Sequence, residues 1–184
     1  MQGSVHRMWS IFKPRTQAQA HVSALYDRIV DTARRPEFYE TGGVPDTAEG
    51  RFELISLHVI IAIRRLNGLG GPGKMAGQAL FEYFFKDMDY AMREMGIGDT
   101  SIGKKVRAMA EVFYGRFKSY AEAADAGDDA ALEAAIRRNI FSDDDAGDAG
   151  ALARYFQASE NRLKDVDLLA GRPSEVLDFP EFSA

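Results

Sequence analysis

The sequence predicts an all-α fold: a single-domain helical bundle of about six helices. Apolar residues recur at the spacing of amphipathic helices along most of the chain. The segments between them are short and rich in Gly, Pro and Asp. No segment shows the strict alternation of a half-buried strand. We divide the chain into an N-terminal extension at 1–15, a helical domain at 16–171 and an irregular C-terminal tail at 172–184.

The first predicted helix spans residues 17–35, with Thr16 as its N-cap candidate and Pro36 ending it. A stripe of apolar residues follows the helical period: Val22, Leu25, Tyr26, Ile29, Val30 and Ala33. Residues 37–46 contain two glycines and a proline, so we expect a loop there.

The second predicted helix spans residues 47–67. Its middle is apolar nearly all round, which is typical of a helix that neighbours bury on several sides. The β-branched run at 59–61 is also compatible with a strand, but the length of the segment and its polar ends favour a helix.

The third predicted helix spans 74–95 and the fourth 101–125, with Gly96 and Gly98 between them. The fourth helix places apolar side chains on one arc and polar ones on the other. The apolar arc holds Ile102, Val106, Met109, Ala110, Phe113, Phe117 and Tyr120, and the polar arc holds Lys104, Arg107, Glu111, Tyr114 and Lys118. Two further helices are predicted at 128–140 and 150–169, separated by an acidic loop.

Composition excludes several classes of protein. The net charge of −5 argues against DNA binding, which needs an excess of cations. The chain has no cysteine, so disulfides, thiolate metal sites and cysteine nucleophiles are excluded. No apolar run reaches the roughly 18 residues of a membrane span, and no signal peptide is visible at the start. We therefore expect a cytoplasmic protein.

Three features of the sequence are compatible with chemistry at a site, and each has a simpler interpretation. His58 stands alone in an apolar helix, without the i±4 partner of a helical metal pair, so we interpret it as a core histidine. Asp87 and Asp89 point away from each other on a helix and indicate a solvated face. The segment 98–105 matches a phosphate-binding loop but ends in Lys105, and a helix rather than a strand precedes it. We expect no catalytic residue, no metal and no cofactor.

One surface is a candidate for binding a partner. Cations gather on the fourth helix just before the acidic stretch 121–148, and such a surface attracts an acidic partner or rRNA. An ordinary solvated face is the simpler interpretation. The candidate partner-binding residues are Lys104, Lys105, Arg107, Tyr114, Arg116, Lys118 and Arg51.

An adaptable apolar surface is a second candidate for gripping a client. Methionines and phenylalanines of the third and fourth helices suit that role, and a packed core is the alternative. These residues are Phe81, Phe84, Phe85, Met88, Met92, Met95 and Met109. The segment from Trp9 to Phe12 beside Lys13 is a candidate for peripheral contact with a membrane.

Residues 25–120 resemble the ubiquinol–cytochrome c chaperone family. The stretches that carry the resemblance are 25–39, 43–58, 78–96 and 98–116. The most specific of them runs Arg-Glu-Met-Gly at 93–96, Gly-Asp at 98–99 and Gly-Lys-Lys-Val at 103–106. The lack of a transit peptide suggests a bacterial member, and no active-site residue can be carried over from the family.

The resemblance implies an assembly factor for respiratory complex III that binds newly made cytochrome b. Its implied partners are cytochrome b or another complex III subunit, a small co-chaperone or the ribosome. We expect such a factor in the cytoplasm or peripherally at the inner face of the cytoplasmic membrane. The alternative is a helical pocket protein that binds a lipid, quinone or haem near His58.

Overall fold

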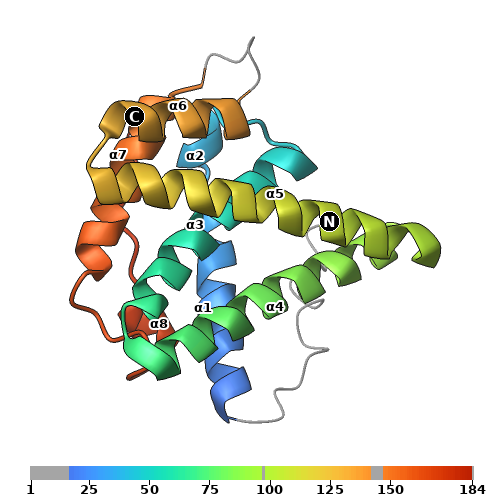
Figure 1. The fold of residues 1–184 in the computed structure, drawn as a ribbon. Helices are drawn as coiled ribbons and strands as arrows, with labels where there is room; N and C mark the ends of the chain where they lie inside the picture. The colour runs from blue at the N-terminus through green and yellow to red at the C-terminus, as the bar shows by residue number, and fades with distance from the viewer. Residues whose placement is uncertain (1–16, 97, 142–146, 184) are drawn as a thin grey trace, which may run out of the picture.

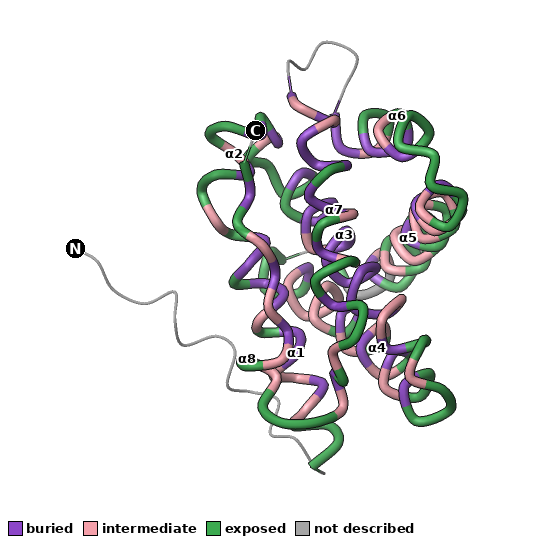
Figure 2. The backbone as a smooth tube through the Cα atoms, turned by 90° about the vertical axis from the view of Figure 1, so that its left-hand side faces the viewer, coloured by how far each residue is buried: buried purple, intermediate pink, exposed green. Residues whose placement is uncertain are grey.

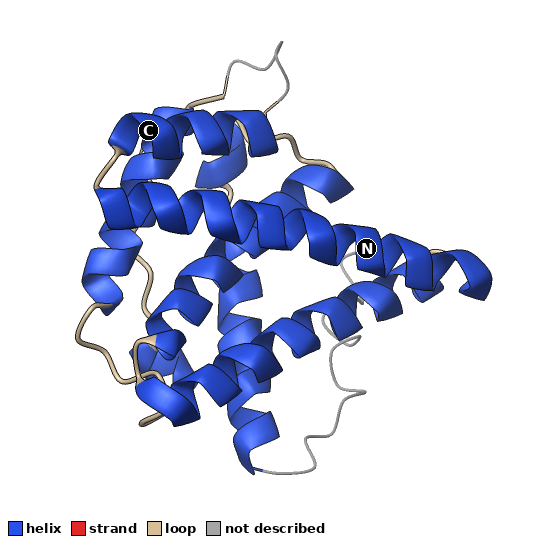
Figure 3. Cartoon of the chain, viewed as in Figure 1, coloured by secondary structure: helices blue, strands red, loops and turns tan. Residues whose placement is uncertain are grey.

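The computed structural model describes residues 17–96, 98–141 and 147–183, and its described elements are all helices (Figure 1, Figure 3). The prediction of an all-helical domain is confirmed. The predicted N-terminal extension and the Trp9–Phe12 segment lie outside the described residues, as does most of the acidic loop. The helices are α1 (Gln17–Ala33), α2 (Glu37–Glu40), α3 (Ala48–Asn67), α4 (Gly70–Glu94), α5 (Asp99–Ala126), α6 (Asp129–Ile140), α7 (Ala149–Leu163) and α8 (Pro173–Val176).

Helix α3 is the centre of the fold. It contacts α1, α4, α5, α6 and α7, and its residues from Leu57 to Ile63 are all buried. Its buried course through the middle of the molecule is visible in Figure 2. Thr47 caps it by accepting a hydrogen bond from the backbone N–H of Gly50 at 3.1 Å. The apolar middle of this helix is therefore buried on all sides, as its sequence predicts.

The corner between α3 and α4 is tighter than the sequence suggests, because α4 begins at Gly70 and not at residue 74. Pro72 fits the first turn of a helix, where no backbone N–H is needed. A Cβ atom on Gly73 would lie 1.9 Å from the carbonyl oxygen of Leu66. Gly73 therefore allows the two helices to meet closely, and the turn between them shortens to Gly68 and Leu69.

Two other segments differ from the sequence prediction. The expected loop at 37–46 contains α2, whose first turn is closed by hydrogen bonds to the Pro36 carbonyl. The last long helix ends at Leu163 and not near residue 169. In the turn that follows, the Asp167 carboxylate accepts a hydrogen bond from the backbone N–H of Leu169, and such local bonds compete with a helix.

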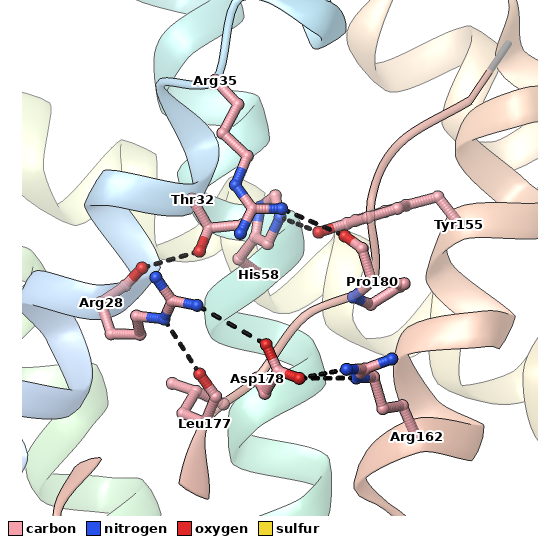
Figure 4. A network of polar contacts seen from close by, with 9 residues as sticks. All are labelled: Arg28, Thr32, Arg35, His58, Tyr155, Arg162, Leu177, Asp178 and Pro180. Carbon is pink, nitrogen blue, oxygen red and sulfur yellow. Dashed lines mark hydrogen bonds and ion pairs between the residues drawn. The ribbon is translucent and has the colours of Figure 1, made fainter. Parts of the chain in front are cut away.

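The C-terminal tail packs into the fold. Its residues 173–176 form α8, and Leu177, Phe179 and Phe182 are buried in the core. Figure 4 shows how polar contacts fasten it: Arg28 donates to the Leu177 carbonyl at 3.1 Å and Arg35 to that of Pro180 at 3.2 Å. We expected an irregular tail; this one lacks regular structure after α8 but belongs to the core.

Candidate functional site

Helices α4 and α5 form an arm that projects from the body. We define the arm as residues 86–96 and 98–109. In Figure 1 the two helices converge at the right, away from α6, α7 and α8. Buried side chains of the arm include Met92 and Ile102, and partly buried Met88, Val106 and Met109 pack against the core. Most of the candidate methionines therefore hold the arm together, and Met95, 66% exposed near the tip, is the exception.

The phenylalanines proposed as a client surface are mostly core residues. Phe84 and Phe85 are buried, and Phe81 is partly buried with its ring centroid 4.7 Å from that of Phe85. They line the region where α4 leaves the body, where Phe113 of α5 joins them. These phenylalanines therefore belong to the packed core, which the sequence analysis gave as the alternative to a client surface.

The outward side of α5 carries the remaining exposed features, and we call it the α5 face. It comprises Lys104, Lys105, Arg107, Val112, Tyr114 and Lys118, all of them exposed. Among the described residues, no ion pair engages Lys104, Lys105 or Arg107, while Lys118 lies 3.9 Å from Glu122. The cations of this face are therefore open to an external partner.

Tyr114 is the aromatic centre of the α5 face. Its side chain is 57% exposed, and its ring centroid lies 5.1 Å from that of Phe81 on α4. Val112, two residues earlier, is 40% exposed but points in a different direction around the helix. An exposed aromatic residue between cations is typical of the residues that anchor protein–protein interfaces.

Arg116 and Arg51, the other two candidate partner-binding residues, lie in different surroundings. Arg116 turns inward to α3 and binds Glu53 through Nε at 2.5 Å and through a terminal nitrogen at 2.6 Å. Arg51 lies near the start of α3 and binds Asp46 at 2.7 Å, with both side chains 59% exposed. That hydrogen bond lowers the pKa of Asp46. Arg116 is therefore committed to an internal pair, whereas Arg51 stays accessible.

Glu53 was missed by sequence reasoning. Burial raises its pKa more than Arg116 lowers it. The signal available in the sequence was a single carboxylate between Phe52 and Leu54 on a helix that is apolar nearly all round. Such a carboxylate needs a cationic partner elsewhere, but the sequence does not say which cation.

Asp87 also has a partner that the sequence did not reveal. Tyr26 of α1 donates its hydroxyl hydrogen to Asp87 of α4 at 3.0 Å. Burial raises the pKa of Asp87, and the Tyr26 hydrogen bond opposes that rise. Asp89 instead pairs with Arg93 one turn later, at 2.7 Å. Only Asp89 fits the solvated face that the sequence indicated.

His58 is fully buried, and both of its ring nitrogens have partners; the contact with Tyr155 is drawn in Figure 4. Nδ1 lies 2.7 Å from the Leu54 carbonyl oxygen, and Nε2 lies 2.8 Å from the Tyr155 hydroxyl. A carbonyl can only accept, so Nδ1 carries the proton and Nε2 accepts from Tyr155. Burial lowers the pKa of His58 to about 4. Binding haem iron through either nitrogen would require breaking a buried hydrogen bond, so this site does not favour the pocket alternative.

The segment 98–105 lies at the start of α5 and follows helix α4, with only Ile97 between Gly98 and the described end of the preceding turn. Ser101 donates its hydroxyl hydrogen to the Gly98 carbonyl at 2.8 Å. A phosphate-binding loop is fed by a strand, so this segment lacks that architecture. It is a helix start, as the simpler interpretation predicts.

A shallow hollow of about 410 Å³ lies between α3, α5 and α7. Arg64 at its edge bridges Glu160 of α7 and Asp125 of α5, the latter at 2.7 Å. These ion pairs join three helices. We therefore interpret the charged side chains at the edge of the hollow as structural.

No helix in the described part of the chain has the length and apolar character needed to cross a membrane. Likewise, no group of three or more acidic or histidine side chains is placed to hold a metal ion among those residues.

Comparison with known proteins identifies the family to which the chain belongs. The family model described as Ubiquinol-cytochrome C chaperone matches residues 40–173. Ubiquinol-cytochrome-c reductase complex assembly factor 1 of Xenopus laevis is 28% identical over 145 residues, which cover 78% of this chain and 72% of the frog protein. The human protein of that name is 27% identical over 118 residues, covering 64% of this chain and 39% of its own length. The chain thus spans about two-fifths of the human relative.

A solved structure has the same fold. The crystal structure of the Cbp3 homolog from Brucella abortus superposes with a TM-score of 0.78 at 35% sequence identity. The match covers 89% of this chain and 91% of that one.

Proposed function

Given that the chain belongs to the ubiquinol–cytochrome c chaperone family, we propose that it is an assembly factor that binds newly made cytochrome b and aids maturation of ubiquinol–cytochrome c reductase. Relatives are named as assembly factors of that complex. We infer that it acts by binding and not by catalysis, in the cytoplasm and at the inner face of the membrane. A co-chaperone or the ribosome would share the task.

The α5 face is the observation that supports this role most directly. It presents Lys104, Lys105 and Arg107 without internal ion pairs among the described residues, next to exposed Tyr114. Cations steer an acidic partner and raise the association rate, while the aromatic side chain supplies contact area. A client segment that carries acidic residues beside apolar ones matches this chemistry.

The buried polar groups support binding rather than catalysis. His58, Glu53 and Asp87 have shifted pKa values, and such groups are candidates for chemistry in general. Each of the three is held by a hydrogen bond to a neighbouring helix or to its own helix. Their shifts therefore have structural causes.

The test is complementation in a strain that lacks the gene. Deletion should lower assembled cytochrome b while its transcript stays unchanged, and the wild-type chain should restore it. A chain with Lys104→Glu, Arg107→Glu and Lys118→Glu should accumulate normally yet fail to restore cytochrome b. Lys74→Glu, an equally exposed cation on α4, is the matched control and should restore it fully.

Crosslinking identifies the client directly. A photoreactive residue at position 104, 107 or 118 should capture cytochrome b, and one at position 74 should not. Normal levels of the assembled complex in the deletion strain would refute the proposal. Capture only of an unrelated protein from all three positions would refute the assignment of cytochrome b as client.

A further inference from the structure

The exposed stripe of α5 has an order of charges that complements itself when reversed. Eight residues of α5 fall on one side of the helix, within an arc of about 100°. They are Lys104, Arg107, Glu111, Tyr114, Gly115, Lys118, Glu122 and Asp125, and all are exposed. Cations occupy the N-terminal end of the stripe, and Glu122 and Asp125 the C-terminal end.

An antiparallel copy of the stripe pairs every charge with its opposite. If Tyr114 of one copy faces Gly115 of the other, Glu111 then faces Lys118. One turn further out Arg107 faces Glu122, and Lys104 faces Asp125. Because a two-fold axis repeats every contact, each of these pairs occurs twice.

Gly115 provides the space that such a contact needs at its centre. A glycine inside a helix is destabilising relative to alanine. A Cβ atom at Gly115 would meet nothing within 4 Å, so packing within one chain does not require glycine there. The 57% exposed Tyr114 beside it is a side chain that can enter this space in a second copy.

We propose that the protein associates with a second copy of itself through an antiparallel α5–α5 contact centred on Tyr114 and Gly115. In Figure 1 α5 crosses the near side of the molecule with its length open to the viewer. Within one chain Lys118 and Glu122 compete only weakly with such a contact, since they are 3.9 Å apart and 75% and 67% exposed. Asp125 is already held by Arg64 at 2.7 Å, so the charge order of the contact depends chiefly on Glu111–Lys118 and Arg107–Glu122.

The contact is small, because one helix face on each side buries less than the roughly 1,200 Å² of a stable interface. We therefore expect a weak dimer that dissociates as salt rises. It would cover the α5 face, so dimerisation and binding of a partner at that face exclude each other. The inference goes beyond the proposed function and is tested on the purified chain alone, whatever the client is.

Sedimentation tests the charge order, from about 10 μM to about 1 mM protein. The wild-type chain should shift from monomer to dimer across that range. Arg107→Glu and Glu122→Arg should each weaken association about tenfold, and combining them should restore it because the pairs re-form with reversed sign. Lys74→Glu is the control and should behave as wild type. A wild-type chain that stays monomeric throughout, or a double variant no better than the single ones, would overturn the proposal.

Gly115→Leu separates association from folding. A Cβ atom at this exposed position meets nothing within 4 Å and leucine favours a helix, so circular dichroism should show an intact fold while the dimer is lost. Dimerisation of this variant as strong as that of wild type would contradict the close approach at Gly115.

Disulfide trapping tests the direction and register of the α5–α5 contact. Because the chain has no cysteine of its own, only the introduced ones can react. Positions 111 and 118 are about 10 Å apart along one helix, beyond disulfide reach. Neither Glu111→Cys nor Lys118→Cys should therefore crosslink by itself. An equal mixture of the two variants should form the mixed disulfide dimer on mild oxidation. Crosslinking of each variant alone as readily as the mixture would rule out the antiparallel register.

Discussion

Arg116 on α5 donates two parallel hydrogen bonds, of 2.5 and 2.6 Å, to the Glu53 carboxylate on α3. The side chains are 17% and 10% exposed, so the pair is largely removed from water. Planar pairing of this kind is among the stronger hydrogen-bond arrangements in proteins. It connects the central helix to the helix that carries the α5 face.

Arg116→Met should destabilise the fold by about 3–5 kcal/mol, because it leaves the Glu53 carboxylate buried without a cation. The measurement is the free energy of unfolding from urea titration at pH 7. Replacing both Glu53 and Arg116 with Met should recover most of the loss, since no buried charge remains. Arg107→Met on the exposed face should change the stability by less than about 0.5 kcal/mol. Equal effects of Arg116→Met and Arg107→Met would contradict the structural role of the pair.

The buried His58 should make the fold sensitive to acid. In the unfolded chain a histidine takes up a proton near pH 6.5, whereas the folded ring does so only at about pH 4. The free energy of unfolding is therefore unaffected by His58 protonation above pH 6.5. It falls by about 3 kcal/mol in all as the pH drops from 6.5 to 4.

The measurement is the stability of wild type minus that of His58→Gln, across this range of pH. The difference removes the titration of carboxylates and other histidines common to both chains. It should shrink as the pH falls. A difference that stays constant from pH 7 to pH 4 would show that His58 is not buried in its neutral form.

The C-terminal tail should contribute strongly to stability. Phe179 is 2% exposed, and its ring meets His58 edge-on at a centroid distance of 4.9 Å. Phe179→Ala should cost about 3–5 kcal/mol by removing a buried ring and leaving a cavity. Thermal unfolding checks this, with the exposed Glu181→Ala as control. If the two variants melt at the same temperature, the tail is not part of the core in solution.

Gly115 and Gly73 should respond in opposite directions to the same substitution. Gly115→Ala should raise the stability by about 0.5–1 kcal/mol, because the new methyl group has free space and alanine favours a helix. Gly73→Ala should lower it, because the methyl group would collide with the Leu66 carbonyl oxygen. Urea titration at low protein concentration keeps association out of the comparison. A loss of stability at Gly115 would mean that the helix face is not open there.

Local periodicity in the sequence was enough to predict several of the helices. The apolar stripe of α1 and the apolar middle of α3 predicted buried helices, and Gly96 and Gly98 predicted the turn between α4 and α5. Each of these follows from residues within a few turns of one another. The exposed side of α5 was also predictable, since Lys104, Arg107 and Tyr114 lie opposite its apolar arc.

The pairing of polar groups between helices could not be predicted in this way. Arg116 and Lys118 are both cations of α5, yet one enters a buried pair with α3 and the other remains in solvent. That difference depends on how two helices cross, which the spacing within either helix does not specify. The same holds for Phe179, whose tail looks irregular in sequence but whose buried ring packs against His58 of α3.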